Sequence, residues 1–162
     1  MPRYGIATIF EDHPVGHEFA ADDLPLHLTH IDSFEVVLQP AELVARLGTL
    51  LAGQKAFSVP ALADEQYGPE KDIPVTVLEL TPELADLHKT LVTFLSEAGA
   101  ILKNPHFNGD YFSPHVSVYG AKRVNPGEPV HIKDISIAAK VSDAEDASRR
   151  ILANIPFASA SS

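Results

Sequence analysis

Hydrophobic and polar positions alternate in several short runs of this chain, which is the pattern of half-buried β-strands. The run over 55–63 contains Pro60, so it is predicted to be an edge or bulged strand. The acidic segments over 11–23 and 64–72 contain proline and glycine and are predicted to be a loop and a turn. The predicted strands are residues 3–10, 25–38, 55–63, 73–80, 115–120 and 130–141.

Two other segments repeat leucines every three or four residues, as an amphipathic helix does. The first is predicted to begin near Pro40, which suits the first helical position, and to end at Gly53. The second has Thr81 as its N-cap and ends at Gly99. Strands, helix, strands, helix and strands in this order predict an α+β domain.

The C-terminal part is predicted to contain a third, short helix. Ser142 and Glu145 have the spacing of a capping box at the start of "DAEDASRRIL", residues 143–152. No linker divides the chain, so we expect one domain over residues 1–162. From about residue 157 the sequence is rich in alanine and serine, and we expect a flexible tail there.

Composition narrows the class of protein. The chain has 162 residues, of which 45% are hydrophobic, enough for one sizeable core. The absence of cysteine excludes disulfides, thiolate metal sites and cysteine nucleophiles. No secretion signal or membrane-spanning apolar run is present, so we expect a cytoplasmic protein without membrane contact. The net charge of −10 argues against a groove for long nucleic acid.

Candidate chemistry lies on two of the predicted strands. The strand over 25–38 contains His27 and Thr29, and the strand over 115–120 contains His115 and Ser117. Side chains two residues apart share one face of a strand. Each strand therefore presents an imidazole and a hydroxyl side by side.

A histidine followed two residues later by serine or threonine is weak evidence in a chain with eight histidines. His88 and Thr90 also match, but they lie in the second predicted helix, where residues two apart point about 200° apart. We discard that match. The other two fall one in each half of the chain, and each half also contains a helix. This arrangement predicts a decayed duplication whose two histidine strands meet across a cleft.

The motifs HLTH (residues 27–30) and HVSV (residues 115–118) resemble the paired H-x-[T/S]-x signature of the 2H phosphoesterase superfamily, also called the 2′–5′ RNA ligase-like family. The resemblance covers roughly residues 3–140. It implies a bilobal, pseudo-symmetric α+β fold in which two antiparallel sheets line a central cleft and the helices lie outside.

The resemblance also implies an activity. His27 and His115 would be the acid–base pair that opens a nucleoside or RNA-end 2′,3′-cyclic phosphate to a 2′-phosphate, with 2′–5′ RNA ligation as a further activity. An imidazole serves either role near neutral pH. Thr29 and Ser117 would bind the phosphate, because hydroxyl donors stabilise charge on its non-bridging oxygens. The scheme needs no metal and no cofactor, and it leaves open which histidine is the base.

The expected partner is a small cyclic nucleotide or an RNA end, bound by a monomer that takes part in RNA processing. Tyr119, Lys122 and Arg123 are candidate nucleotide contacts. Many relatives have an arginine soon after the second motif, whereas here Tyr119 and Gly120 follow it and positive charge comes only at Lys122 and Arg123. Lys103 is a further candidate for a second phosphate. The alternative is a nucleotide- or RNA-end-binding module with the same fold and little turnover.

The remaining histidines and aromatic residues are weaker candidates. The family usually has an apolar residue in place of His30, which we expect to be a partly buried or surface histidine. His13 and His17 lie among carboxylates and represent a minor metal-site alternative. His106 is a candidate for the mouth of the cleft. Candidate base-stacking residues are Tyr67, Phe107, Tyr111, Phe112 and Tyr119.

Overall fold

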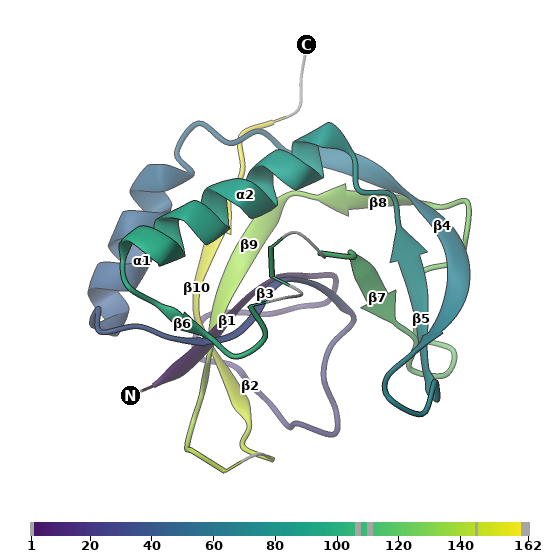
Figure 1. The fold of residues 1–162 in the computed structure, drawn as a ribbon, viewed down its shortest axis with the longest axis horizontal. Helices are drawn as coiled ribbons and strands as arrows, with labels where there is room; N and C mark the ends of the chain where they lie inside the picture. Colours follow the sequence, from purple (N-terminus) through teal and green to yellow (C-terminus); the bar gives the residue numbers. More distant parts are fainter. Residues whose placement is uncertain (1, 106–107, 110–111, 145, 160–162) are drawn as a thin grey trace.

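The computed structural model describes residues 2–105, 108–109, 112–144 and 146–159, and it confirms the α+β class (Figure 1). The helices are α1 (Pro40–Leu50) and α2 (Pro82–Glu97). The strands are β1 (Arg3–Ile9), β2 (Glu18–Phe19), β3 (His27–Glu35), β4 (Phe57–Tyr67), β5 (Ile73–Leu78), β6 (Ile101–Leu102), β7 (His115–Ser117), β8 (Pro129–Ile132), β9 (Asp134–Lys140) and β10 (Arg149–Pro156).

The strands form one antiparallel, open path with the order β2-β10-β9-β1-β3-β7-β5-β4-β8, and β6 also pairs with β3. The two predicted sheets are therefore joined. The junction is a single residue pair, Leu28 of β3 with Val116 of β7. We call β2, β10, β9, β1, β3 and β6 the first strand group, and β7, β5, β4 and β8 the second strand group; they lie on either side of this junction (Figure 1).

Both helices bury most of their leucines in one hydrophobic core with the strands. Pro40 begins α1 as predicted, and Leu43 and Leu47 are fully buried. The predicted cap of α2 is confirmed, because the Thr81 hydroxyl accepts a hydrogen bond from the Leu84 backbone N–H at 3.3 Å. Figure 1 shows α2 running across the outside of the strands. The core of helices and strands leaves the other face of β3 for the candidate site.

The prediction of a third helix over 143–152 is wrong. Residues Arg149–Pro156 form β10, which pairs antiparallel with β9 along its whole length. The Ser142 hydroxyl accepts a hydrogen bond from the Ala144 backbone N–H at 3.3 Å, so it closes a local turn and does not cap a helix. Pairing with β9 outweighs the local capping signal, which is worth only about 1 kcal/mol.

Two strand boundaries also differ from the prediction. The charged segment over 64–72 was predicted to be a turn, but β4 continues to Tyr67 and pairs with β5 before the chain reverses at Gly68, whose φ is 94°. The predicted single strand over 130–141 is divided at Lys133. Its first part, β8, pairs with β4, and its second part, β9, pairs with β1 and β10, so the chain passes there between the two strand groups.

The segments outside the main elements make further contacts. The predicted loop over 11–23 contains the short strand β2, which pairs with β10. In the predicted tail, the Phe157 backbone N–H donates to the Lys133 carbonyl and the Ala158 N–H donates to the Gln54 carbonyl. Within the described residues, neither helix combines the length and the apolar character that crossing a membrane requires.

Candidate functional site

The pairing of β3 with β7 brings the two histidine motifs side by side. Leu28 and Val116 face each other and are 0% exposed, which directs both side chains into the core. Because side chains alternate along a strand, the flanking residues of both strands share the opposite face. These four half-buried residues are His27, Thr29, His115 and Ser117, which we call the histidine–hydroxyl cluster.

The register fixes how this cluster is arranged. Antiparallel pairing extended by one residue from Leu28 and Val116 puts His27 across from Ser117 and Thr29 across from His115. Residues directly opposite have Cβ atoms about 5 Å apart, and the diagonal pairs are about 7–8 Å apart. The two imidazoles therefore occupy one diagonal of a square and the two hydroxyls the other, so a group of the size of a phosphate can touch all four.

Both imidazole rings are held in the same way. The His27 Nδ1 lies 2.7 Å from the Pro25 carbonyl oxygen, and the His115 Nδ1 lies 3.0 Å from the Ser113 carbonyl oxygen. A carbonyl only accepts hydrogen bonds, so each Nδ1 carries a proton and donates it. In a neutral ring this leaves Nε2 as a lone-pair acceptor. The carbonyl two residues upstream thus sets the tautomer at both positions.

The surroundings of His27 favour its neutral form. Burial lowers the pKa of His27, and the nearby His115 and Lys122 lower it further. The hydrogen bond to the Pro25 carbonyl and the Glu11 carboxylate act in the opposite direction. The net result is a pKa below the usual value of 6.5, so His27 is available to accept a proton at neutral pH.

An ion pair near His27 joins the loop after β1 to the turn after β7. The Lys122 Nζ lies 2.8 Å from the Glu11 Oε2 and donates to the Leu24 carbonyl at 3.3 Å. The same carboxylate accepts a hydrogen bond from the Leu26 backbone N–H. Lys122 first and Leu26 second lower the pKa of Glu11. The pair fixes the segment that leads into His27, a role for Glu11 that no sequence pattern indicates.

The three candidate nucleotide contacts separate in the structure. The Lys122 Nζ lies 5.6 Å from the centre of the Tyr119 ring. Burial raises the pKa of Tyr119, and its contact with the Ser117 side chain partly offsets this. Arg123 instead binds Asp64 and lies 3.4 Å from the Thr76 Oγ1. Thr76 pairs with a residue that points into the core, so its face is opposite to that of the histidine–hydroxyl cluster.

Tyr67, a candidate for base stacking, contacts His115. The two rings meet edge to face with their centres 4.8 Å apart. The Tyr67 hydroxyl lies 2.8 Å from the Ser113 Oγ, and Ser113 also supplies the carbonyl that holds the His115 ring. Tyr67 therefore orients His115 from the neighbouring hairpin.

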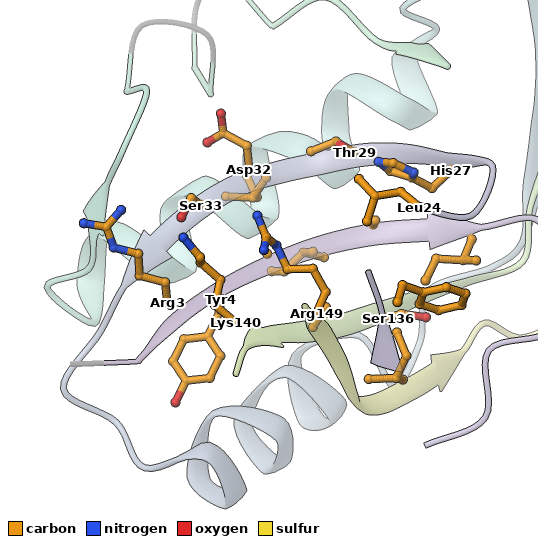
Figure 2. A pocket seen from close by; sticks show the side chains of 18 of the residues that line it. Arg3, Tyr4, Leu24, His27, Thr29, Asp32, Ser33, Ser136, Lys140 and Arg149 are labelled. Atoms are coloured by element: carbon orange, nitrogen blue, oxygen red, sulfur yellow. The ribbon is translucent and has the colours of Figure 1, made fainter. Parts of the chain in front are cut away.

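A pocket of about 320 Å³ runs along the first strand group and ends at His27 and Thr29 (Figure 2). His115 and Ser117 border the junction and are not among its lining residues. Four cationic residues line the pocket: Arg3, Lys103, Lys140 and Arg149. Sequence reasoning singled out only Lys103, because β9–β10 pairing brings Lys140 and Arg149 here and β10 was mistaken for a helix.

His30 belongs to the core, which corrects the expectation of a surface or partly buried residue. Its side chain is 0% exposed, and its Nε2 lies 2.7 Å from the Thr8 Oγ1. The Thr8 hydroxyl donates its proton to the Asp134 carbonyl, so Nε2 is the donor to Thr8. Burial first, and then the proximity of His88, lower the pKa of His30 to about 3. His30 is therefore neutral, and it bonds β3 to β1 on the face opposite to the histidine–hydroxyl cluster.

The minor metal-site alternative receives no geometric support from the described residues. The His13 Nδ1 donates to the Glu11 carbonyl and its Nε2 lies 3.5 Å from Asp134, whereas His17 packs against Phe19. No three His, Asp or Glu residues in the described ranges are placed to hold a metal ion. Phe112 stacks on His88 with ring centres 3.8 Å apart. Three further candidates, His106, Phe107 and Tyr111, lie outside the described residues.

Comparison with known proteins identifies the fold. No protein-family model and no curated protein sequence matches the chain. Solved structures do: a phosphoesterase is 17% identical, with a TM-score of 0.58 and 98% of this chain and 99% of that chain covered. E. coli LigT complexed with 3′-AMP is 17% identical, with a TM-score of 0.60, and the match covers 97% of this chain and 99% of that chain. The LigT complex with ATP is 17% identical, with a TM-score of 0.57, and the match covers 98% of this chain and 99% of that chain. The chain therefore has the fold of these phosphoesterases.

Proposed function

We propose that this protein is a metal-independent 2H-type cyclic phosphodiesterase. It opens the 2′,3′-cyclic phosphate of a nucleoside or RNA end to a 2′-phosphate. The observation that supports this most strongly is the histidine–hydroxyl cluster, in which two imidazoles held in the same tautomer share one face of two paired strands. The likeness to LigT structures that hold 3′-AMP and ATP supports a nucleotide ligand.

We propose complementary roles for the two histidines. His27, whose pKa is lowered by burial, accepts a proton from the attacking water through Nε2. The water oxygen bonds to phosphorus while the bond from phosphorus to the ribose 3′-oxygen breaks. His115, protonated on Nε2, donates its proton to that leaving oxygen. The product keeps its phosphate on the 2′-oxygen, and proton exchange with solvent restores both rings.

The two hydroxyls of the cluster serve the phosphate itself. Negative charge gathers on the non-bridging oxygens during displacement, and donors already in position there lower the barrier. Thr29 and Ser117 flank the same space as the imidazoles and are suited to donate these hydrogen bonds. If a ribose 5′-hydroxyl attacks in place of water, the same groups produce a 2′–5′ linkage, which is the ligase activity of the proposed family.

The proposal is tested with adenosine 2′,3′-cyclic phosphate, followed by chromatography with and without a chelator. Wild type is expected to yield adenosine 2′-phosphate in both conditions, and His27→Ala and His115→Ala are each expected to lose about 10²–10⁴-fold in kcat. His131→Ala, which changes an exposed histidine on β8, is the matched control.

Unchanged turnover in either His27→Ala or His115→Ala would contradict the assignment. Binding of the nucleotide by wild type without any turnover would favour the alternative of a binding module. Loss of turnover on chelation would instead indicate a metal-dependent reaction.

A further inference from the structure

The end of the pocket remote from His27 carries three cations in one row across the sheet. Arg149 of β10 pairs directly with Lys140 of β9. On the other side of β9, Ala139 pairs with Tyr4, so the next position of the same register puts Lys140 beside Arg3. Arg3 forms an ion pair with Glu35 at 3.2 Å. Of the three residues in the row, Arg3 thus has a carboxylate partner, and among the described residues Lys140 and Arg149 have none.

This arrangement costs stability in the protein alone. Like charges directly opposite on antiparallel strands repel each other, and both side chains are half-buried. In the described part of the chain, no carboxylate forms an ion pair with Lys140 or Arg149, and the Arg149 guanidinium donates only to the Ala147 carbonyl. A bound anion would remove the repulsion and turn the row into a binding feature.

The carboxylate at this end of the pocket is already satisfied. Asp32 accepts hydrogen bonds from the side-chain amides of Asn104 at 2.6 Å and Asn108 at 2.7 Å. These donors are neutral, so Asp32 keeps its negative charge, but among the described residues it forms no ion pair with the row and is outnumbered by the four cationic residues of the lining. Lys103, next to Asn104, adds a further positive charge to the lining. The local excess of positive charge stands out in a protein whose net charge is −10.

The cationic row and the histidine–hydroxyl cluster share one continuous floor. Gly5 and Ala7 of β1 and Ala138 of β9 line the pocket between them, and no side chain larger than a methyl group at these three positions obstructs it. Ala7 pairs with Thr29, and Arg3 lies four positions before Ala7 on the same strand, a distance of about 13 Å. Figure 2 shows the nitrogen ends of Lys140 and Arg149 pointing toward Ser33 of β3, while His27 and Thr29 lie at the other end.

We propose that Lys140 and Arg149, assisted by Lys103 and Arg3, form a second anion subsite that binds another phosphate of the same ligand whose cyclic phosphate lies at the histidine–hydroxyl cluster. The inference rests on the proposed function for the identity of the reacting group. It makes the preferred substrate a nucleotide with at least two separated phosphate groups. That second group is either the phosphodiester of a short oligonucleotide or the 5′-phosphate of a mononucleotide, and both present the same chemistry to the row.

The test compares the Lys140→Gln/Arg149→Gln double variant with wild type. The matched control is Arg46→Gln/Lys89→Gln, which removes the same two charges from exposed positions on the helices. The substrates are adenosine 2′,3′-cyclic phosphate, the same compound with a 5′-phosphate, and a dinucleotide with a 2′,3′-cyclic phosphate end. Calorimetry with adenosine 2′-phosphate and adenosine 2′,5′-bisphosphate measures binding separately from turnover.

Wild type and the control are expected to prefer the ligands with two phosphates. In the double variant, the ratio of kcat/KM for two-phosphate over one-phosphate substrates is expected to fall about tenfold, and so is the corresponding ratio of affinities. Its kcat/KM and Kd for the one-phosphate ligands are expected to stay within about twofold of the wild-type values. Its dependence of log Kd on log salt is also expected to become shallower. If kcat/KM falls more for the 5′-phosphorylated mononucleotide, the second phosphate is a 5′-phosphate. If it falls more for the dinucleotide, the second phosphate is a phosphodiester.

Two results would overturn the proposal: equal binding of one-phosphate and two-phosphate ligands by wild type, or an equal loss in the double variant and the control. An equal loss for both classes of ligand in the double variant would also contradict it, because that would show damage to the whole pocket. Absence of turnover by wild type would refute the proposed function, and the calorimetric comparison would still decide the subsite.

Discussion

The strands β3 and β7 each contribute one imidazole and one hydroxyl to the histidine–hydroxyl cluster, but from different surroundings. β3 has nine residues and pairs with β1 on one side and with β6 and β7 on the other. β7 has three residues between β3 and β5. Three extended residues and one upstream carbonyl are therefore enough to set the direction and tautomer of an imidazole. Burial also lowers the pKa of His27 on β3.

The fourth motif position shows the second difference between the strands. It is His30 in the β3 motif and Val118 in the β7 motif. His30 is buried behind the site, where it bonds to Thr8 of β1. The first motif thus makes a polar contact in the core through His30, whereas the corresponding positions of the second motif, Val116 and Val118, are apolar. If these differences matter for function, substitutions at equivalent positions of β3 and β7 should have unequal effects.

The largest expected effect comes from removing both imidazoles. His27→Asn and His115→Asn should each lower kcat for adenosine 2′,3′-cyclic phosphate by about 10²–10⁴-fold. Because the two rings act in one displacement, the double variant should be no more than about tenfold slower than the slower single variant. Single-turnover kinetics measures this. Losses that multiply would show that the two histidines act independently.

The hydroxyls should matter less than the imidazoles. Thr29→Val and Ser117→Ala each remove one donor from the phosphate and should lower kcat/KM by about 10–100-fold. Both variants keep the strand pairing, so circular dichroism and the melting temperature serve as controls for folding. A loss in only one of the two variants would show that the phosphate lies nearer to one strand than the register indicates.

The fourth motif position predicts a difference in acid stability. The folded-state pKa of His30 is about 3, so between pH 6.5 and 3 only the unfolded chain binds a proton at this residue. Acidification across that window favours unfolding by up to about 1.4 kcal/mol per pH unit. His30→Val introduces the residue found at the fourth position of the second motif. It should remove the His30 contribution to the pH dependence of the free energy of unfolding.

Denaturant unfolding at several pH values measures the His30 effect. The comparison is between slopes, so a general loss of stability in His30→Val does not obscure it. His131→Val, at an exposed position of β8, should retain the wild-type slope. An identical slope in wild type and His30→Val would contradict the account.

The smallest expected effect concerns the ion pair beside His27. Lys122 lowers the pKa of His27 and neutralises Glu11, whose carboxylate raises it. In Lys122→Met the pKa of His27 should rise, and the acidic limb of the pH profile of kcat/KM should move to higher pH. Lys133→Met is the control. A shift to lower pH would show that His27 is not the base.

The sequence predicts those features that depend on neighbours along the chain. Thr81 and Pro82 mark the start of α2, and alternation alone puts His27 with Thr29 and His115 with Ser117. The same local reasoning fails for β10, because its structure is decided by pairing with β9 and the Ser142 signal is satisfied by a turn. It also fails at Lys133, where one continuous β pattern in the sequence becomes two strands, β8 paired with β4 and β9 paired with β10.

The parts of the site that the sequence did not predict all depend on distant pairing. Glu11 is held beside the cluster by Lys122, from the turn after β7, and by the Leu26 backbone N–H. Lys140 and Arg149 form a row only once β9 and β10 are paired. Arg123 looked equivalent to Lys122 in the sequence, yet Asp64 holds it on the other face. Adjacent residues on a turn can thus reach opposite faces of one sheet.

The central claim is that both imidazoles and both hydroxyls surround one phosphoryl group. A crystal structure with adenosine 2′-phosphate tests it most directly. We expect one phosphate within hydrogen-bond distance of the Nε2 atoms of His27 and His115 and of the hydroxyls of Thr29 and Ser117. A phosphate bound elsewhere, or held by only one of the two histidines, would contradict it.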